Sequence, residues 1–259
     1  MSERPWIEVA ADLEDLAGRA ARLFSEAARA AVAARGRFAV ALSGGSTPRP
    51  VYERLAGPHH REEVPWARIE FFWADERCVP PEAPDSNYRM ARETLLDRVA
   101  VDPERVHRIR GEAEPAAAAR ECAGELRRAL DAAGEEPPHL DLALLGLGPD
   151  GHTASLFPDS AAIESDRLAE AVPAALVLPP VVDRVTLTPV ALNAARAVAF
   201  LVSGGSKAAA VRAALEGPRD PARCPAQAIA PTRGRARWLL DAEAAAGLEG
   251  LDRPAAKGP

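Results

Sequence analysis

Short apolar runs alternate along the chain with longer stretches whose apolar residues recur every three or four positions. Runs that predict strands cover residues 7–10, 38–42, 69–73, 106–109, 140–145, 184–188, 197–202 and 237–240. Stretches with helical spacing cover 13–31, 49–55, 87–96, 115–132, 163–171 and 207–215. Strands that alternate with helices predict βαβ units. We therefore expect one three-layer, doubly wound α/β domain over residues 1–246, with a mainly parallel sheet and helices on both faces.

Residues 247–259, which are polar and contain glycine and proline, predict a mobile C-terminal tail. The composition of the whole chain, with 47% hydrophobic and 27% charged residues, is that of a soluble globular protein. No apolar stretch reaches membrane-spanning length, and the N-terminus lacks the apolar core of a signal peptide. Cys78, Cys122 and Cys224 are far apart and odd in number, which favours reduced cysteines in a cytoplasmic protein.

The net charge of −6 argues against a nucleic-acid-binding surface. It leaves room for a basic pocket that binds a small anionic molecule. The sequence does not decide between a monomer and a small homo-oligomer.

The stretch from 140 to 158 carries the strongest chemical signal. Its apolar first part predicts a strand buried on both faces, and the strand ends in a turn rich in glycine and proline. That turn places Asp150 and His152 two positions apart, with Gly151 between them. Ligands of open parallel sheets bind at the carboxyl ends of the strands, and imidazole titrates near neutral pH. The pair is therefore a candidate reaction centre.

Residues 146–151 also fit the dinucleotide fingerprint G-x-G-x-x-G. A nucleotide site would require a helix that starts at once and offers its amides to the pyrophosphate. Pro149 removes one amide, and Asp150 would place a negative charge beside the phosphates. We therefore do not expect a nucleotide here.

Two further strand ends resemble anion-binding turns. The first consists of Ser43, Gly44, Gly45, Ser46 and Thr47, and it offers backbone amides and hydroxyls at a helix N-terminus. The second, 203–207, repeats the design and ends in Lys207, whose charge opposes the helix dipole unless an anion binds there. A tight strand-to-helix turn and a solvated lysine are the alternatives.

A third strand end, after residue 73, carries Asp75, Glu76 and Arg77. The guanidinium of Arg77 could bind a phosphate in bidentate fashion, but the residues alone favour an ion pair with a neighbouring carboxylate. The adjacent His59 and His60 predict an exposed loop rather than a pair of metal ligands. No histidine has the spacing of a catalytic metal site, so we expect no metal.

The ordered set of motifs resembles the 6-phosphogluconolactonase family. These motifs are SGGSTP (43–48), WADERCVP (73–80), DSNY (85–88), GLGPDGHTASLFP (146–158) and RVTLT (184–188). The resemblance implies the glucosamine-6-phosphate-deaminase-like fold, and hydrolysis of 6-phospho-D-glucono-1,5-lactone to 6-phosphogluconate in the oxidative pentose phosphate pathway. It also implies that no metal or organic cofactor is required.

The chemistry of these residues and the resemblance together predict roles for individual residues. His152 would act as general base on water, and Asp150 would orient the imidazole or bind a sugar hydroxyl. The phosphate and substrate ligands would be Arg77, Lys207 and Arg184, together with Asp75, Gly151 and the turn Ser43–Thr47. Amides around Gly44 and Gly45 would stabilise the oxyanion.

Two other functions are compatible with the same pattern. One is an amino-sugar-phosphate deaminase or isomerase, in which an acidic residue and an asparagine follow the histidine; residues 153–158, TASLFP, resemble the lactonase instead. The other is a non-catalytic sugar-phosphate sensor, although the chain shows no basic recognition helix.

Overall fold

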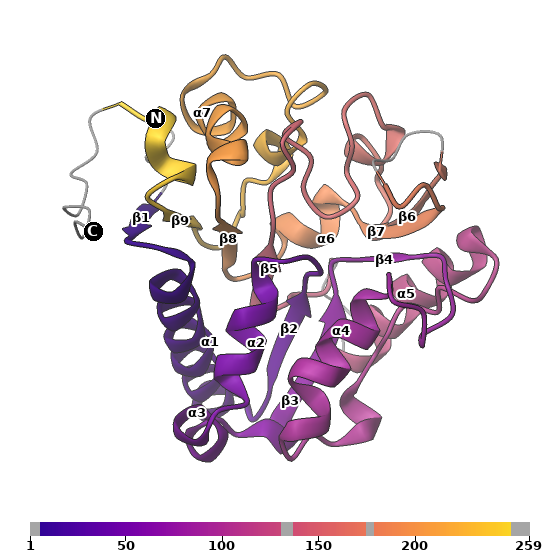
Figure 1. Ribbon diagram of the computed structural model, residues 1–259. Coiled ribbons are helices and arrows are strands. Elements are labelled where there is room, and N and C mark those ends of the chain that lie inside the picture. The colour runs from indigo at the N-terminus through magenta and orange to yellow at the C-terminus, as the bar shows by residue number, and fades with distance from the viewer. Residues whose placement is uncertain (1–5, 131–136, 175–178, 250–259) are drawn as a thin grey trace.

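The computed structural model describes residues 6–130, 137–174 and 179–249. Its centre is a six-stranded parallel sheet in the order β1-β9-β8-β5-β2-β3 (Figure 1). The strands are β1 (Trp6–Ala10), β2 (Phe38–Leu42), β3 (Ile69–Trp73), β5 (Leu142–Leu145), β8 (Val198–Val202) and β9 (Ala236–Asp241). The predicted parallel α/β sheet is thus confirmed, with the first strand at an edge.

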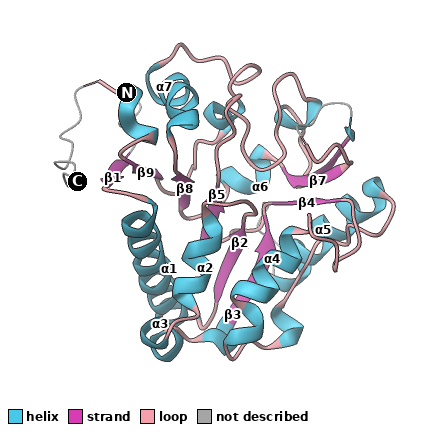
Figure 2. Cartoon of the chain, in the orientation of Figure 1, coloured by secondary structure: helices cyan, strands magenta, loops and turns pink. Residues whose placement is uncertain are grey.

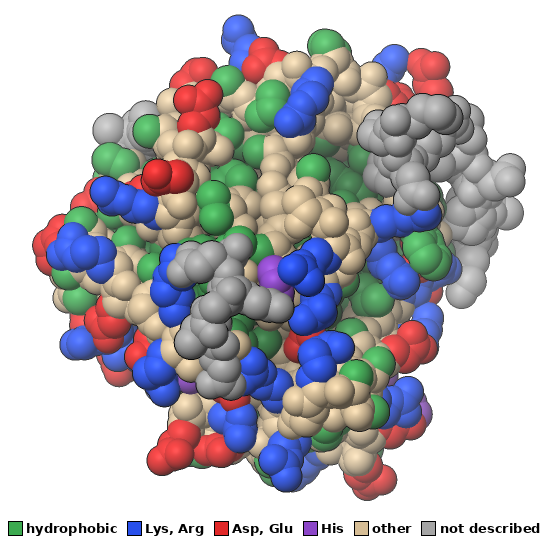
Figure 3. Space-filling view, turned by 180° about the vertical axis from the view of Figure 1, so that it is seen from behind, with side chains coloured by type: hydrophobic (Ala, Val, Ile, Leu, Met, Phe, Trp, Pro, Cys, Tyr) green, Lys and Arg blue, Asp and Glu red, His purple; other side chains and the backbone are tan. Residues whose placement is uncertain are grey.

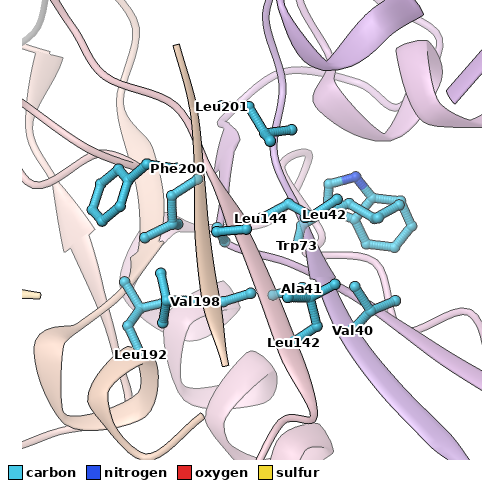
Figure 4. Packing of buried hydrophobic residues seen from close by; sticks show 14 of the residues in the cluster. Val40, Ala41, Leu42, Trp73, Leu142, Leu144, Leu192, Val198, Phe200 and Leu201 are labelled. Carbon is cyan, nitrogen blue, oxygen red and sulfur yellow. The ribbon is translucent and has the colours of Figure 1, made fainter. Parts of the chain in front are cut away.

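Every residue of β2, β3, β5 and β8 is buried. Burial on both faces of a strand is typical of a sheet that is covered by helices above and below. Figure 4 shows side chains of these strands packed together, among them Leu42, Leu144 and Phe200. Burial of one such side chain stabilises the fold by about 1.5–3 kcal/mol.

The helices are α1 (Leu13–Arg35), α2 (Pro48–Leu55), α3 (Pro58–Glu63), α4 (Asn87–Thr94), α5 (Pro115–Ala129), α6 (Pro189–Asn193) and α7 (Ala208–Glu216). In α1 the side chain of Asp12 accepts a hydrogen bond from the amide of Asp15, and Gly36 ends the helix at φ 75°. Figure 1 shows α1, α2 and α4 in a row in front of the sheet. None of the described helices is long and apolar enough to cross a membrane.

A second, smaller sheet was not predicted. It is antiparallel, in the order β4 (Asp75–Arg77), β7 (Arg184–Leu187) and β6 (Ala169–Val172). Figure 2 shows β4 and β7 beyond the arrowheads of β2 and β3. Since β4 follows β3 after a single residue, Ala74, the small sheet lies against the edge at which the parallel strands end.

Several predicted elements were wrong. The helix predicted over 163–171 is absent: a short 3-10 helix ends at Ile163, and the last three residues belong to strand β6, which pairs with β7. Residues 106–109 make only an isolated bridge from Val106 to Phe71. The segment with His59 and His60 is helix α3, in which His60 is buried.

At the C-terminal side the packed structure extends beyond the predicted boundary. Gly247 ends a short 3-10 helix, and Leu248, which was assigned to the tail, is 4% exposed. Residues 250–259 of the predicted tail and residues 131–132 at the end of the predicted 115–132 helix lie outside the described residues.

Candidate active site

The site lies where the strand order reverses. From β2 the chain continues to β3 at one edge, whereas β5 leads through β8 to β9 on the other side. The turns after β2 and β5 therefore diverge and leave a crevice, which is where α/β sheets bind ligands. A cavity of about 180 Å³ opens there. It is lined by Ser43, Gly44, Gly45, Ser46, Thr47, Asp75, Arg77, Asn87, Gly148, His152, Arg184, Ser203 and Lys207, among others.

The turn after β2 offers unused hydrogen-bond donors. The hydroxyl of Tyr52 donates to the carbonyl of Ser43 (2.8 Å) and accepts from its amide (3.1 Å), which fixes the start of the turn. Gly45 has φ 101°, a conformation that favours glycine. Within the described residues, the amides of Gly44, Gly45, Ser46 and Thr47 have no protein acceptor. They are available to an anion at the start of α2.

The turn after β5 holds His152 and Asp150 together. Oδ1 of Asp150 lies 2.6 Å from Nδ1 of His152 and accepts a second hydrogen bond from its backbone amide at 3.2 Å. The Nδ1 proton therefore belongs to this bond, and Nε2 is the nitrogen left to accept a proton. Burial raises the pKa of Asp150, but the hydrogen bond and charge of His152 outweigh it and leave that pKa below its usual value.

Asp150 and Gly151 do not line the cavity, in contrast to the other predicted site residues. Gly151, at φ 85°, allows the turn, and its carbonyl accepts from the amide of Ala226 at 3.0 Å. No helix follows this turn: Thr153 and Leu156 form a bridge instead. The amides that a dinucleotide would need are therefore not arranged here.

Arg77 and Arg184 are cross-strand neighbours in β4 and β7. Arg77 donates from Nη1 to the carbonyl of Asp85 at 2.7 Å, and its buried Nε has no partner among the described residues. The predicted ion pair of Arg77 with an adjacent carboxylate is not found among them. The Glu76 carboxylate instead accepts from the amides of Arg77, Asn87 and Tyr88 at 2.7–2.8 Å, because it caps the start of α4.

Burial lowers the pKa of Arg184, and the charge of Asp75 opposes that shift. Two adjacent guanidinium groups repel each other, so an anion between them would be favourable. Figure 3 shows that Lys and Arg side chains gather on one face of this acidic protein. The charged residues that line the cavity are Arg77, Arg184, Lys207 and Asp75, so the local charge there is positive although the chain as a whole is acidic.

Asn87 and Ser155 are site residues that the sequence analysis missed. Asp75 accepts from Oγ of Ser155 at 2.6 Å and from Nδ2 of Asn87 at 3.2 Å. Oδ1 of Asn87 is buried without a hydrogen-bond partner and touches Gly44 so closely that a Cβ there would lie 1.7 Å away. The motif 85–88 contained the signal for Asn87, but no spacing rule links it to Asp75.

The turn from Ser203 to Lys207 differs from the prediction of a second anion-binding turn. Two of its amides already have carboxylate partners: that of Gly204 donates to Asp241 and that of Gly205 donates to Glu243 at 3.2 Å. These carboxylates supply the negative charge that was expected from a bound anion. The side chain of Lys207 lines the cavity, and burial lowers the pKa of its ammonium group while the charge of Asp150 opposes that shift.

One cluster in the described chain has the donor atoms of a metal site. His59, His60 and Glu63 each offer an atom within 4.8 Å of the others. Nδ1 of His60 is already hydrogen-bonded to Ser25 (2.9 Å), and Glu63 lies 3.7 Å from the guanidinium of Arg29. The cluster lies on α3, apart from the cavity described above.

Comparison with known proteins agrees with this geometry. The family model described as glucosamine-6-phosphate isomerases/6-phosphogluconolactonase matches residues 11–238. A 6-phosphogluconolactonase from Nostoc sp. is 39% identical over 249 residues, which cover 93% of this chain and 98% of the relative. The solved structure of 6-phosphogluconolactonase from Trypanosoma brucei has a TM-score of 0.81 and 33% identity, and covers 95% of this chain and 100% of its own.

A solved monomeric glucosamine-6-phosphate deaminase also shares the fold, with a TM-score of 0.78 over 94% of this chain and 100% of its own. Its identity of 22% supports the fold alone.

Proposed function

The chain belongs to the glucosamine-6-phosphate isomerase/6-phosphogluconolactonase family, and we propose that it hydrolyses 6-phospho-D-glucono-1,5-lactone to 6-phospho-D-gluconate with His152 as general base. The observation that carries this proposal is the single cavity that His152 shares with Arg77, Arg184 and Lys207. A phosphorylated ester needs both a cationic pocket for its phosphate and a base for the attacking water.

In the reaction, Nε2 of neutral His152 takes a proton from water while the water oxygen bonds to C1 of the lactone. The bond between C1 and the ring oxygen then breaks, and the proton passes from His152 to that oxygen, which becomes a hydroxyl. Asp150 keeps the proton of the other ring nitrogen in place through the 2.6 Å bond, so the imidazole presents Nε2 to the water.

The hydrogen-bond donors that line the cavity have complementary roles. Arg77, Arg184 and Lys207 bind the phosphate by charge-assisted hydrogen bonds. The amides of Gly44 and Gly45 donate to the oxyanion that develops at C1. The carboxylate of Asp75, oriented by Ser155 and Asn87, accepts from a sugar hydroxyl.

The segment after His152 favours lactonase over deaminase chemistry. Thr153 donates from Oγ1 to the carbonyl of Gly146 at 2.8 Å, and Ser155 donates to Asp75, so neither adds an acidic group to the site. Hydrolysis as proposed uses only water and these side chains, without a cofactor. The net charge supports the absence of a nucleic-acid partner, and the three free cysteines support a cytoplasmic location.

A continuous acid-release assay with freshly generated 6-phosphogluconolactone tests the proposal. We expect acid production well above spontaneous hydrolysis, slower turnover of unphosphorylated gluconolactone, and no ammonia from glucosamine 6-phosphate. Ammonia release, or lactone hydrolysis at the spontaneous rate, would contradict it.

A further inference from the structure

Asp241 is a buried carboxylate at the end of β9, and it holds the turn that carries Lys207. Its side chain accepts from the hydroxyl of Ser203, from the amide of Gly204 at 3.0 and 3.1 Å, and from the amide of Ala244 at 2.8 Å. The residue is 5% exposed. In the described part of the chain no Lys or Arg forms an ion pair with it, so its charge is balanced by these donors alone.

Hydrogen bonds connect Asp241 to Lys207 through the backbone of Gly204. Gly204 has φ 96°, and its carbonyl accepts from the amide of Lys207 at 3.0 Å. One residue, Gly204, thus joins the carboxylate on one side and the lysine backbone on the other. The side chain of Lys207 makes no hydrogen bond or ion pair within the described residues, so its position depends on the backbone that carries it.

We propose that Asp241 is a positioning residue for phosphate recognition: by fixing the turn 203–207 it holds Lys207 at the cavity. This inference rests on the proposed lactonase function and adds to it a residue outside the cavity. Because Asp241 touches no substrate, its effect must pass through Lys207. A charge-assisted hydrogen bond weakens steeply when its donor is displaced.

A double-mutant cycle tests the inference. Asp241→Asn, Lys207→Ala and the double variant are compared by KM for 6-phosphogluconolactone and by turnover of unphosphorylated gluconolactone. We expect Asp241→Asn to raise KM for the phosphorylated lactone about 10-fold, the scale of one hydrogen bond to a charged group. Turnover of gluconolactone should stay unchanged. In the Lys207→Ala background the Asp241 change should add nothing, because coupled residues are not additive.

Asp141→Asn is the matched control. Asp141 is also a buried aspartate, and it accepts from the amide of Ala39 at 2.8 Å and from Arg35 at 2.6 Å. It lies just before the central strand β5, at the amino ends of the parallel strands, whereas the turn 203–207 follows the carboxyl end of β8. This variant should lose stability and keep the phosphate preference. If Asp241→Asn folds poorly, Ser203→Ala removes one donor to the same carboxylate and should shift KM in the same direction by less.

Equal loss of activity toward both lactones, or additive effects of the Asp241 and Lys207 changes, would overturn the inference. A wild-type protein that does not hydrolyse the phosphorylated lactone would instead refute the proposed function. The two failures are therefore distinguishable.

Discussion

Gly148 lies directly against His152: a Cβ on Gly148 would lie 2.0 Å from Nδ1 of the imidazole and 2.5 Å from Oδ1 of Asp150. The backbone of the turn at Gly148 thus packs directly against the hydrogen-bonded side chains of Asp150 and His152. Its position is set by the amide of Gly148, which donates to the carbonyl of His152 at 2.8 Å.

Gly148→Ala should therefore abolish most of the activity. The added methyl group cannot fit without moving the imidazole away from Asp150, and misplaced catalytic groups cost about 100-fold in rate. The measurement is kcat for phosphogluconolactone together with the thermal midpoint. Gly124→Ala, which places a methyl group in open space on α5, is the control and should retain full activity. Normal turnover by Gly148→Ala would show that the pair tolerates displacement.

Acid stability should depend on Asp150. The pKa of this carboxyl is depressed below 3.8 in the folded protein, so it stabilises the fold above that pH and stops doing so as the pH falls through the folded-state pKa. Wild type should consequently lose unfolding free energy more steeply below pH 3.8 than Asp150→Asn. Denaturant titrations of both proteins between pH 6 and pH 3 measure the difference, and parallel curves would mean that His152 does not hold the carboxylate.

The cationic side chains should determine the preference for the phosphorylated lactone. Lys207→Ala and Arg77→Ala should each lower kcat/KM for this substrate by about 10- to 100-fold, because each removes a charge-assisted hydrogen bond. Turnover of gluconolactone, which has no phosphate, should change little. A loss that is the same for both lactones would place the phosphate elsewhere.

Gly44 and Asn87 should be coupled. Gly44→Ala would place a methyl group 1.7 Å from Oδ1 of Asn87, and we expect the overlap to destabilise the protein by about 1–3 kcal/mol. Asn87→Ala in the same chain opens space for the methyl group and should restore part of that stability, although not the orientation of Asp75. Chemical unfolding of both single variants and the double variant measures the coupling; strictly additive losses would rule out the direct contact.

All six strands of the parallel sheet could be predicted, because the sequence of a buried parallel strand is a continuous apolar run. The small antiparallel sheet could not. Its strand β4 consists of Asp75, Glu76 and Arg77, whose pairing with β7 is set by tertiary contacts rather than by an apolar pattern. The helix prediction for residues 163–171 was wrong for a related reason. An apolar segment with interspersed charged residues is compatible with a helix as well as with an edge strand.

The part of the site that consists of turns at strand ends could be predicted from the sequence. The turns at 43–47 and 146–152 follow adjacent strands, β2 and β5, so parallel-sheet rules alone bring them together. Arg184 belongs to the other sheet, and Asn87 and Ser155 meet at Asp75 through the tertiary fold. The hydrogen bonds of Asp241 to the 203–207 turn could not be predicted either, because the two segments are far apart in sequence.

The most direct test of the account is the rate at which His152→Ala hydrolyses fresh 6-phosphogluconolactone, corrected for spontaneous hydrolysis, in a sample whose thermal midpoint shows an intact fold. With His152 as the general base, we predict a loss of about 10²- to 10⁴-fold in kcat. A folded variant that turns over the lactone at the wild-type rate would contradict it.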